Sequence, residues 1–237
     1  MSARRPSLPH QPANEQTGKG AKPFGGRFAV DLYVFVERSI FETDSEWLSA
    51  LETLSGLEVE GLAIQVRTRG EAPHRGLGLA RQAREATQGA AVPVLLNGLT
   101  EMALELGYVG VHWPEVLIPE RDEKPGLLRG ASVHSPEAVA KAEAAGADFV
   151  VAGTVFDAGS KPAAGAGLEA LRRMADSTQL PVLAIGGVTP ERAAACIAAG
   201  AAGVAVVSSV LRAPDMAAAV QDLRAAVDGA RLAGSPC

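Results

Sequence analysis

The sequence has few of the features that mark a disulfide-linked, metal-binding or membrane protein. It contains two cysteines in 237 residues, Cys196 in an Ala-rich stretch and Cys237 at the end, and neither has metal-ligand spacing. A disulfide between a helix-buried cysteine and a tail cysteine is not expected, so the pattern favours a reducing compartment, and we expect a cytoplasmic protein. No apolar run approaches the roughly 18 residues that a membrane span requires.

A positive excess of charge is also missing. Asp and Glu total 27 against 22 Lys and Arg, which gives a net charge of −5. A mildly acidic chain has no general attraction for nucleic acid or for an anionic membrane, so we expect neither partner, and any bound anion requires a local site. Hydrophobic residues make up 47% of the chain, which is enough for one sizeable core.

The composition predicts three segments. Residues 1–27 are rich in Pro, Gly and polar residues and lack the apolar segment of a signal peptide, so they are expected to form a disordered arm. Residues 28–230 are expected to form one domain, and 231–237 a short flexible tail. The sequence does not indicate what the arm does.

From residue 28 onward, short β-branched runs alternate with Ala/Leu-rich helical runs, which predicts a parallel sheet with helical crossovers. The eight expected strands are Val30–Glu37, Gly61–Arg67, Val92–Asn97, Tyr108–His112, Arg129–Val133, Asp148–Ala152, Val182–Ile185 and Gly203–Val207. Their near-continuous apolar character suits strands buried on both faces. We therefore expect an α/β fold, a closed (β/α)₈ TIM barrel. An open doubly wound sheet is the alternative, which the strand count disfavours.

Helix boundaries are also visible in the sequence. Gly107, Gly146 and Gly200 each follow a helical run and precede a strand, as expected of glycines that end helices in the left-handed conformation. Ser135-Pro136 and Thr189-Pro190 are typical helix starts, with a capping hydroxyl followed by proline in the first turn.

The last two strands end in residues suited to an anion. Gly186 and Gly187 follow the seventh strand, and Val207 and Ser208 end the eighth. A Gly-Gly pair alone is typical of a tight turn. Beside a serine at a helix start on the next strand, however, it indicates a phosphate site, which barrels often place after strands seven and eight.

Polar residues end several other strands, at the edge where barrels carry their chemistry. The expected substrate-binding residues are Gln65, Arg67, Asn97, His112, Ser132 and, on the loop after strand six, Lys161. Alternation places Gln65 and Arg67 on one face, and Ser132 and His134 on one face. The alternatives are ordinary surface charges for Arg67 and Lys161 and a structural histidine at either histidine position.

The sequence from about Phe28 to Arg212 resembles the thiamine phosphate synthase/TenI superfamily. The matching segments are Gln65-Val66-Arg67, Leu95-Leu96-Asn97, Gly110-Val111-His112, Ser132-Val133-His134-Ser135, Gly153-Thr154-Val155-Phe156, Lys161-Pro162, Ala184-Ile185-Gly186-Gly187-Val188-Thr189-Pro190 and Gly203-Val204-Ala205-Val206-Val207-Ser208. The Gly-Gly-Val-Thr-Pro segment with the downstream Val-Val-Ser is the most specific of these.

The resemblance implies one of two activities. Synthases join a pyrimidine methyl diphosphate to a thiazole phosphate with Mg²⁺ held by two aspartates, whereas TenI-type tautomerases aromatise a thiazole carboxylate phosphate without a metal. Here Gly98 and Leu117 stand near the two aspartate positions, and Glu115 is the only nearby carboxylate. We therefore expect a metal-free tautomerase without a cofactor, with a Mg²⁺-dependent synthase and a non-catalytic phosphate binder or regulator as alternatives.

The resemblance also implies roles for individual residues. The ligand, a small phosphorylated thiazole, would place its phosphate on Gly186, Gly187, Val207 and Ser208, and His134 would transfer the proton. His112 is the rival proton carrier, although it discriminates less because synthases also carry a histidine there. A homo-oligomer is possible.

Overall fold

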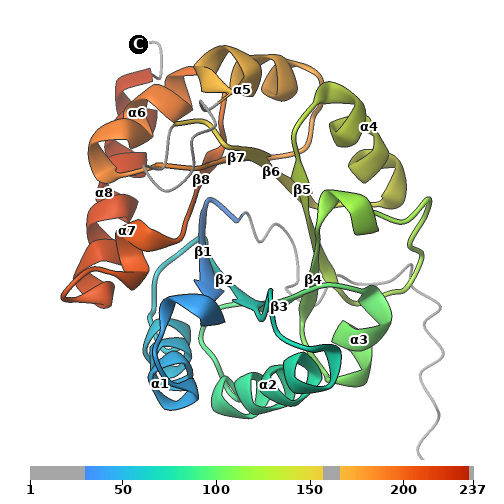
Figure 1. Cartoon of the computed structure of the whole chain (residues 1–237). Coiled ribbons are helices and arrows are strands. Elements are labelled where there is room, and N and C mark those ends of the chain that lie inside the picture. Colours follow the sequence, from blue (N-terminus) through green and yellow to red (C-terminus); the bar gives the residue numbers. More distant parts are fainter. Residues whose placement is uncertain (1–29, 157–165, 235–237) are drawn as a thin grey trace, which may run out of the picture.

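The computed structural model describes residues 30–156 and 166–234, which form a closed barrel of eight parallel strands in sequence order, surrounded by helices (Figure 1). The strands are β1 (Leu32–Glu37), β2 (Leu62–Arg67), β3 (Val94–Asn97), β4 (Gly110–Trp113), β5 (Leu128–Val133), β6 (Phe149–Gly153), β7 (Val182–Ile185) and β8 (Gly203–Val206). The α-helices are α1 (Asp44–Ser55), α2 (Pro73–Ala86), α3 (Thr100–Glu105), α4 (Pro136–Ala145), α5 (Gly167–Asp176), α6 (Pro190–Ala198), α7 (Ser208–Leu211) and α8 (Met216–Gly234). Two short 3₁₀ helices, η1 (Arg38–Ile40) and η2 (Glu115–Leu117), follow β1 and β4.

The barrel closes by the pairing of β1 with β8, where Leu32, Tyr33 and Val34 lie opposite Val204, Ala205 and Val206. This pairing confirms the expected (β/α)₈ barrel and excludes the open-sheet alternative. Each expected strand is present, and its observed ends differ from the expected ones by at most two residues. Continuous apolar runs therefore identified every strand, because parallel strands in such a barrel are buried on both faces.

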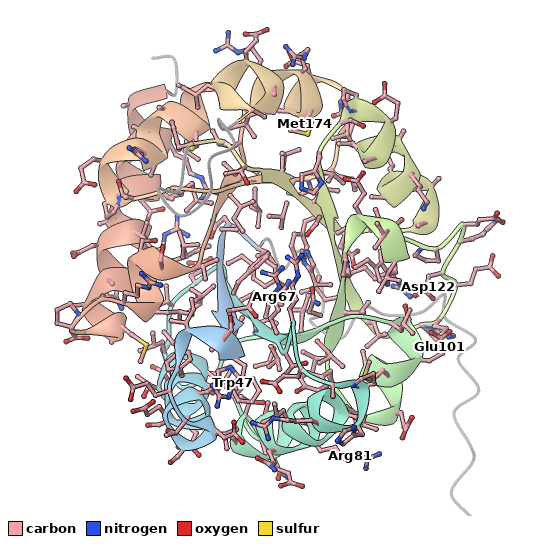
Figure 2. The ribbon with its side chains drawn as sticks, viewed as in Figure 1. Trp47, Arg67, Arg81, Glu101, Asp122 and Met174 are labelled. Atoms are coloured by element: carbon pink, nitrogen blue, oxygen red, sulfur yellow. The ribbon has the colours of Figure 1, made fainter. Side chains whose placement is uncertain are left out.

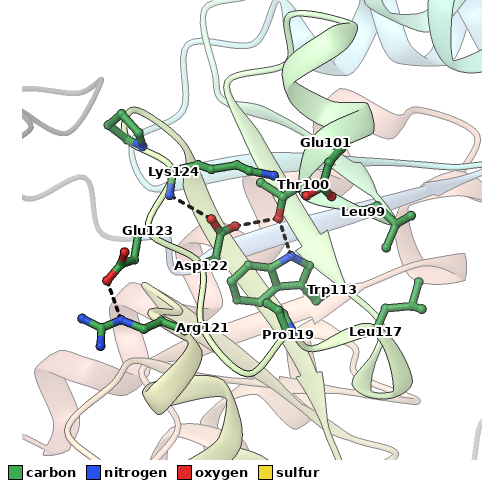
Figure 3. A pocket seen from close by; sticks show the side chains of 11 residues that line it. Leu99, Thr100, Glu101, Trp113, Leu117, Pro119, Arg121, Asp122, Glu123 and Lys124 are labelled. Atoms are coloured by element: carbon green, nitrogen blue, oxygen red, sulfur yellow. Dashed lines mark hydrogen bonds and ion pairs between the residues drawn. The ribbon is translucent and has the colours of Figure 1, made fainter.

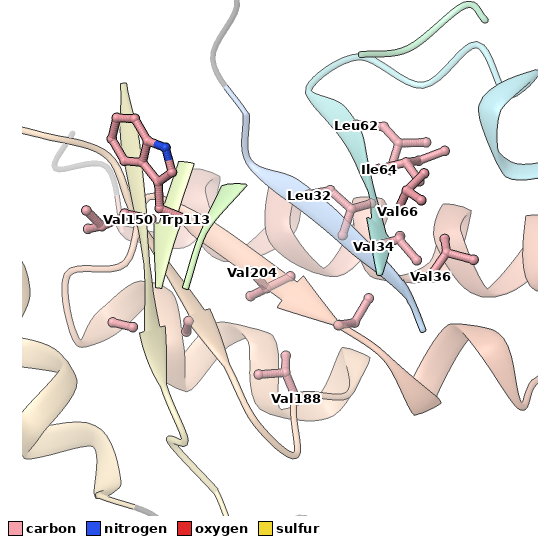
Figure 4. Close-up of a cluster of buried hydrophobic side chains, with 14 of the residues drawn as sticks. Leu32, Val34, Val36, Leu62, Ile64, Val66, Trp113, Val150, Val188 and Val204 are labelled. Carbon is pink, nitrogen blue, oxygen red and sulfur yellow. The ribbon is translucent and has the colours of Figure 1, made fainter. Parts of the chain in front are cut away.

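The outward faces of the strands pack against the helical ring. Leu32, Val34, Val36 and Ile64 project from β1 and β2 into this layer and are fully buried (Figure 4). Trp47 of α1 packs against them, and its indole N–H donates to the carbonyl of Val36 at 3.1 Å. Burying an aliphatic side chain of this size contributes about 1.5–3 kcal/mol, so this layer carries much of the stability.

The inward faces form a second, smaller core that includes Tyr33, Phe35, Leu95 and Phe149. Gly130 of β5 gives this core its space, because a Cβ there would lie 2.5 Å from the Phe149 ring and 2.8 Å from His112 Nδ1. Apolar side chains make up most of this inner core, which also encloses the Gln65 amide and the Tyr33 hydroxyl.

The glycines expected to end helices do so. Gly107, Gly146 and Gly200 have φ values of 71°, 92° and 94°, in the region that L-residues rarely occupy. The expected cap of α4 is confirmed, since the Ser135 hydroxyl accepts from the N–H of Ala138 at 3.2 Å. The expected hydroxyl cap of α6 is wrong, because Thr189 Oγ1 instead donates to the Glu191 carboxylate at 2.6 Å.

The last helix extends further than expected. α8 includes residues 231–234, which the sequence assigned to a tail, because Arg231 reaches back to Asp31 with an Nη1–Oδ2 distance of 2.6 Å. The expected arm, residues 1–27, lies outside the described residues, as does Cys237. Cys196 is free and buried.

Within the described ranges, no helix combines the length and the apolar character needed to cross a bilayer.

Candidate active site

The carboxyl ends of the eight strands meet at one end of the barrel, here called the mouth. Glu37, Arg67, Asn97, His112 and Ser132 lie at or near the ends of β1 to β5, each on the inward side of its strand by the alternation that buries Phe35 and Leu95. Figure 2 shows Arg67 directed toward the centre of the ring of strands. The expected polar residues of four strands, β2 to β5, therefore gather in one place with Glu37 of β1, where barrels carry their chemistry.

Arg67 is paired at the mouth with a residue that the strand-end pattern did not include. Its Nη1 lies 2.8 Å from Glu37 Oε2, and the Arg67 and Glu37 side chains are 24% and 11% exposed. Burial raises the pKa of the Glu37 carboxyl, and the positive charges of Arg67 and Arg69 partly offset this effect. Glu37 could have been found from sequence, since it ends the first strand on the same face as Tyr33 and Phe35.

His112 and Ser132 meet on neighbouring strands, with the histidine Nε2 2.8 Å from the serine Oγ. Burial, aided by the charge of Arg67, lowers the pKa of the fully buried His112 to about 3. His112 is therefore a neutral hydrogen-bonding residue near pH 7. Its Nδ1 has no hydrogen-bond partner among the described residues, and Gln65, also fully buried, lies beside the Tyr33 hydroxyl.

His134 lies at the outer rim of the mouth, one residue after β5, and its side chain is 65% exposed. Its Nδ1 is 2.6 Å from Oε2 of Glu115, which belongs to η2 in the connection after β4. No hydrogen bond joins His134 to the His112–Ser132 pair. Sequence reasoning placed Glu115 near the family's metal positions but did not indicate its contact with His134.

The anion site expected after β7 and β8 has suitable backbone geometry. Gly186 and Gly187 have φ values of 102° and 59°, and their N–H groups donate to no described residue. Their carbonyls are engaged: Gly186 accepts from Phe156 N–H at 3.0 Å, and Gly187 accepts from Arg192 Nη1 at 2.8 Å. The carbonyls are thus held while the amide N–H groups remain available to an anion.

Ser208 follows Val207 directly after β8 and is the first residue of α7, and it is exposed. The pairing of Ile185 with Ala205 sets β7 and β8 side by side. The two parts of the expected phosphate site, Gly186-Gly187 and Val207-Ser208, are therefore adjacent, and this site is called the cradle below. α7 is a single turn, so any anion there depends on local N–H and hydroxyl donors and not on a long helix dipole. A side chain at Gly186 would collide with Thr154, 2.3 Å from its Cβ position. Lys161 lies outside the described residues.

The donors around the family's two metal positions do not fit a two-carboxylate magnesium site. Gly98 is buried against Met102, Leu99 and Leu117 present exposed carbon side chains, and Glu115 is already bonded to His134. Mg²⁺ requires hard oxygen ligands, usually one or two carboxylates. Among residues 30–156 and 166–234, no three His, Cys, Asp or Glu side chains form a group that could hold a metal ion.

A separate pocket of about 570 Å³ lies outside the barrel, between α3 and the connection from β4 to β5 (Figure 3). Asp122 accepts from the Thr100 hydroxyl at 2.6 Å, and Thr100 in turn accepts from the Trp113 indole at 3.1 Å. Its charged rim residues pair among themselves, as in the Arg121–Glu123 contact at 2.7 Å. None of the expected site residues lines this pocket, so the mouth is the better candidate.

Comparisons with known proteins agree with the fold and identify the family. The chain matches the family described as thiamine monophosphate synthase over residues 32–210. It is 36% identical to thiamine-phosphate synthase of Moorella thermoacetica over 209 residues, which cover 85% of this chain and 97% of that protein. It is 38% identical to the thiamine-phosphate synthase of Methanoculleus marisnigri over 215 residues, which cover 86% and 98%.

Among solved structures, thiamine phosphate pyrophosphorylase from Pyrococcus furiosus superposes with a TM-score of 0.67 at 31% identity, covering 85% of this chain and 96% of that one. A 3-hexulose-6-phosphate synthase from Salmonella typhimurium, with a TM-score of 0.61 at 18% identity over 84% and 99% of the chains, shares the fold alone. The extent of the family match and the identity to these relatives settle the assignment: the chain belongs to the thiamine monophosphate synthase family.

Proposed function

We propose that this protein is an enzyme of thiamine biosynthesis that binds a thiazole phosphate at the barrel mouth. The observation that carries the proposal is the pair of N–H groups at Gly186 and Gly187, which donate to no described residue and lie near Ser208, at the start of α7 after the adjacent strand β8. Backbone N–H groups and a hydroxyl bind phosphate without a general positive charge, as the net charge of −5 requires.

The reaction that the comparisons favour is that of the synthase, in which the thiazole nitrogen displaces pyrophosphate from a pyrimidine methyl diphosphate. The named relatives at 36% and 38% identity are thiamine-phosphate synthases. They support the synthase alternative over the tautomerase that the missing aspartates led us to expect. In this proposal the cradle holds the thiazole phosphate, and His112, Ser132 and Gln65 line the ring-binding interior.

A second candidate, tautomerisation of a thiazole carboxylate phosphate, is favoured by the donor set. The two metal positions carry Gly98 and Leu117, and the nearest carboxylate, Glu115, bonds His134. A histidine held by a carboxylate at a strand end suits proton transfer, which requires no metal. His134 would carry the proton, because burial keeps the alternative, His112, neutral with a pKa of about 3.

Two turnover assays on the intact chain separate these reactions. The first supplies pyrimidine methyl diphosphate and thiazole phosphate, with and without Mg²⁺, and measures pyrophosphate release. The second supplies thiazole carboxylate phosphate alone and follows aromatisation by absorbance. Pyrophosphate release supports the synthase, and aromatisation without metal supports the tautomerase. Binding of thiazole phosphate with no turnover in either assay identifies a binder, and absence of binding overturns the proposal.

A further inference from the structure

The contact between Glu115 and His134 joins two segments that are separate in the sequence. Glu115 lies in η2, in the connection after β4, and His134 follows β5 directly. His134 Nδ1 and Glu115 Oε2 are 2.6 Å apart, slightly shorter than the about 2.7–2.9 Å that is usual for a charge-assisted N–H···O hydrogen bond. The Glu115 side chain is 37% exposed, so this is a contact at the rim and not a buried ion pair.

We infer that Glu115 is a positioning residue for His134, holding the imidazole with its proton on Nδ1 and leaving Nε2 as the proton-accepting atom. A carboxylate oxygen can only accept, so the hydrogen bond requires an N–H on Nδ1. When one imidazole nitrogen donates its proton to a fixed acceptor, the other nitrogen of the neutral ring is left without a proton and can accept one. The inference deepens the assignment of His134 to proton transfer and rests on it for its functional consequence.

The placement of Glu115 also accounts for its displacement from the family's metal positions. A carboxylate engaged with a histidine is a poor Mg²⁺ ligand, and its neighbours Val116 and Leu117 offer no side-chain oxygen. Val116 is 87% exposed, so η2 is not held by burial of that side chain, and the bond to His134 links η2 to the residue that follows β5. Glu115, which stands near the family's metal positions, is thus hydrogen-bonded to His134.

A measurement of the His134 tautomer tests the inference without any substrate. ¹⁵N NMR of the full chain at about pH 9, above the ordinary imidazole pKa, distinguishes protonated from bare ring nitrogens. His134→Asn assigns the signal by its loss. We expect Nδ1 protonated and Nε2 bare in the wild type, and exchange between both tautomers in Glu115→Ala. Glu115→Gln should keep the wild-type tautomer, because its amide oxygen still accepts. Glu123→Ala, an exposed glutamate on the same connection, should change nothing.

Kinetics test the consequence. Glu115→Ala should lower kcat by about 10-fold with KM within about twofold, the pattern of a lost orienting contact. In the His134→Asn background the same substitution should have no further effect. Bare Nδ1 in the wild type, or an unchanged tautomer in Glu115→Ala, overturns the inference. If His134→Asn leaves turnover intact, the proton-transfer assignment fails, whereas the tautomer measurement still decides whether Glu115 orients the ring.

Discussion

Arg67 and Glu37 form an ion pair across the register position where β1 and β2 end, with 2.8 Å between Nη1 and Oε2. This ion pair changes the role that is expected of Arg67. The guanidinium that was expected to bind substrate is already balanced by a carboxylate inside the barrel. The remaining N–H groups of Arg67 can still contact a ligand. The part of the mouth at the ends of β1 and β2, however, carries less positive charge than Arg67 alone would give it.

Breaking this ion pair should destabilise the fold. Arg67→Met leaves the largely buried Glu37 carboxylate without its partner, and we expect the free energy of unfolding to fall by about 1–3 kcal/mol. Adding Glu37→Gln should recover much of the loss, because no uncompensated charge remains. Urea unfolding of Arg67→Met, Glu37→Gln and the double variant measures the coupling. Arg81→Met, which breaks an exposed pair with Glu105, is the control and should cost under about 1 kcal/mol. Strictly additive losses would contradict the pairing.

His112 should make the protein sensitive to acid. Its pKa is lowered to about 3 in the folded state, whereas in the unfolded chain it titrates near its usual 6.5. Between these values the unfolded state binds the extra proton, so stability falls as pH decreases, by about 1.4 kcal/mol per pH unit. His112→Gln should remove this part of the slope between about pH 6 and 4.5. Equal slopes in wild type and His112→Gln would place the histidine in a more polar environment.

A charge at Gly187 should abolish anion binding. Its φ of 59° lies in the left-handed region that Asp and Asn tolerate, so both variants should fold. Gly187→Asp places a negative charge at the cradle, and we expect affinity for thiazole phosphate to fall by about 100-fold or more. Gly187→Asn, of the same shape, should lose much less. Calorimetric titration compares them, and equal affinities in the two variants would place the phosphate elsewhere.

His134→Asn should lower turnover by about 10²–10⁴-fold in the aromatisation assay while ligand affinity changes little. The wild-type ring is bonded to Glu115, and asparagine cannot accept and return the proton. Steady-state kinetics with thiazole carboxylate phosphate give kcat, and titration gives affinity. Turnover within about twofold of wild type would assign proton transfer to another group.

The strands were predictable because each is a short, mostly apolar run, as expected of strands buried on both faces. Three helix ends were predictable at Gly107, Gly146 and Gly200, because glycine readily adopts the positive φ that ends a helix. The position of the mouth also followed from sequence, since parallel strands bring their carboxyl ends together.

Contacts between connections were not predictable. The Glu115–His134 bond depends on how the loop after β4 folds back on β5, and the Asp31–Arg231 pair joins residues 200 apart in the sequence. The missing cap at Thr189 has a local cause, because the nearby Glu191 carboxylate attracts the hydroxyl that could have capped the helix. Strand and turn chemistry is local, whereas side-chain pairing across loops depends on the folded chain.

The central claim is that the N–H groups of Gly186 and Gly187, with Ser208, bind the phosphate of a thiazole ligand. Isothermal titration calorimetry of the wild type with thiazole phosphate and with the matching unphosphorylated alcohol tests it most directly. The phosphorylated form should bind about 100-fold more tightly, a difference of about 2.7 kcal/mol. Equal affinities for the phosphate and the alcohol would contradict the account.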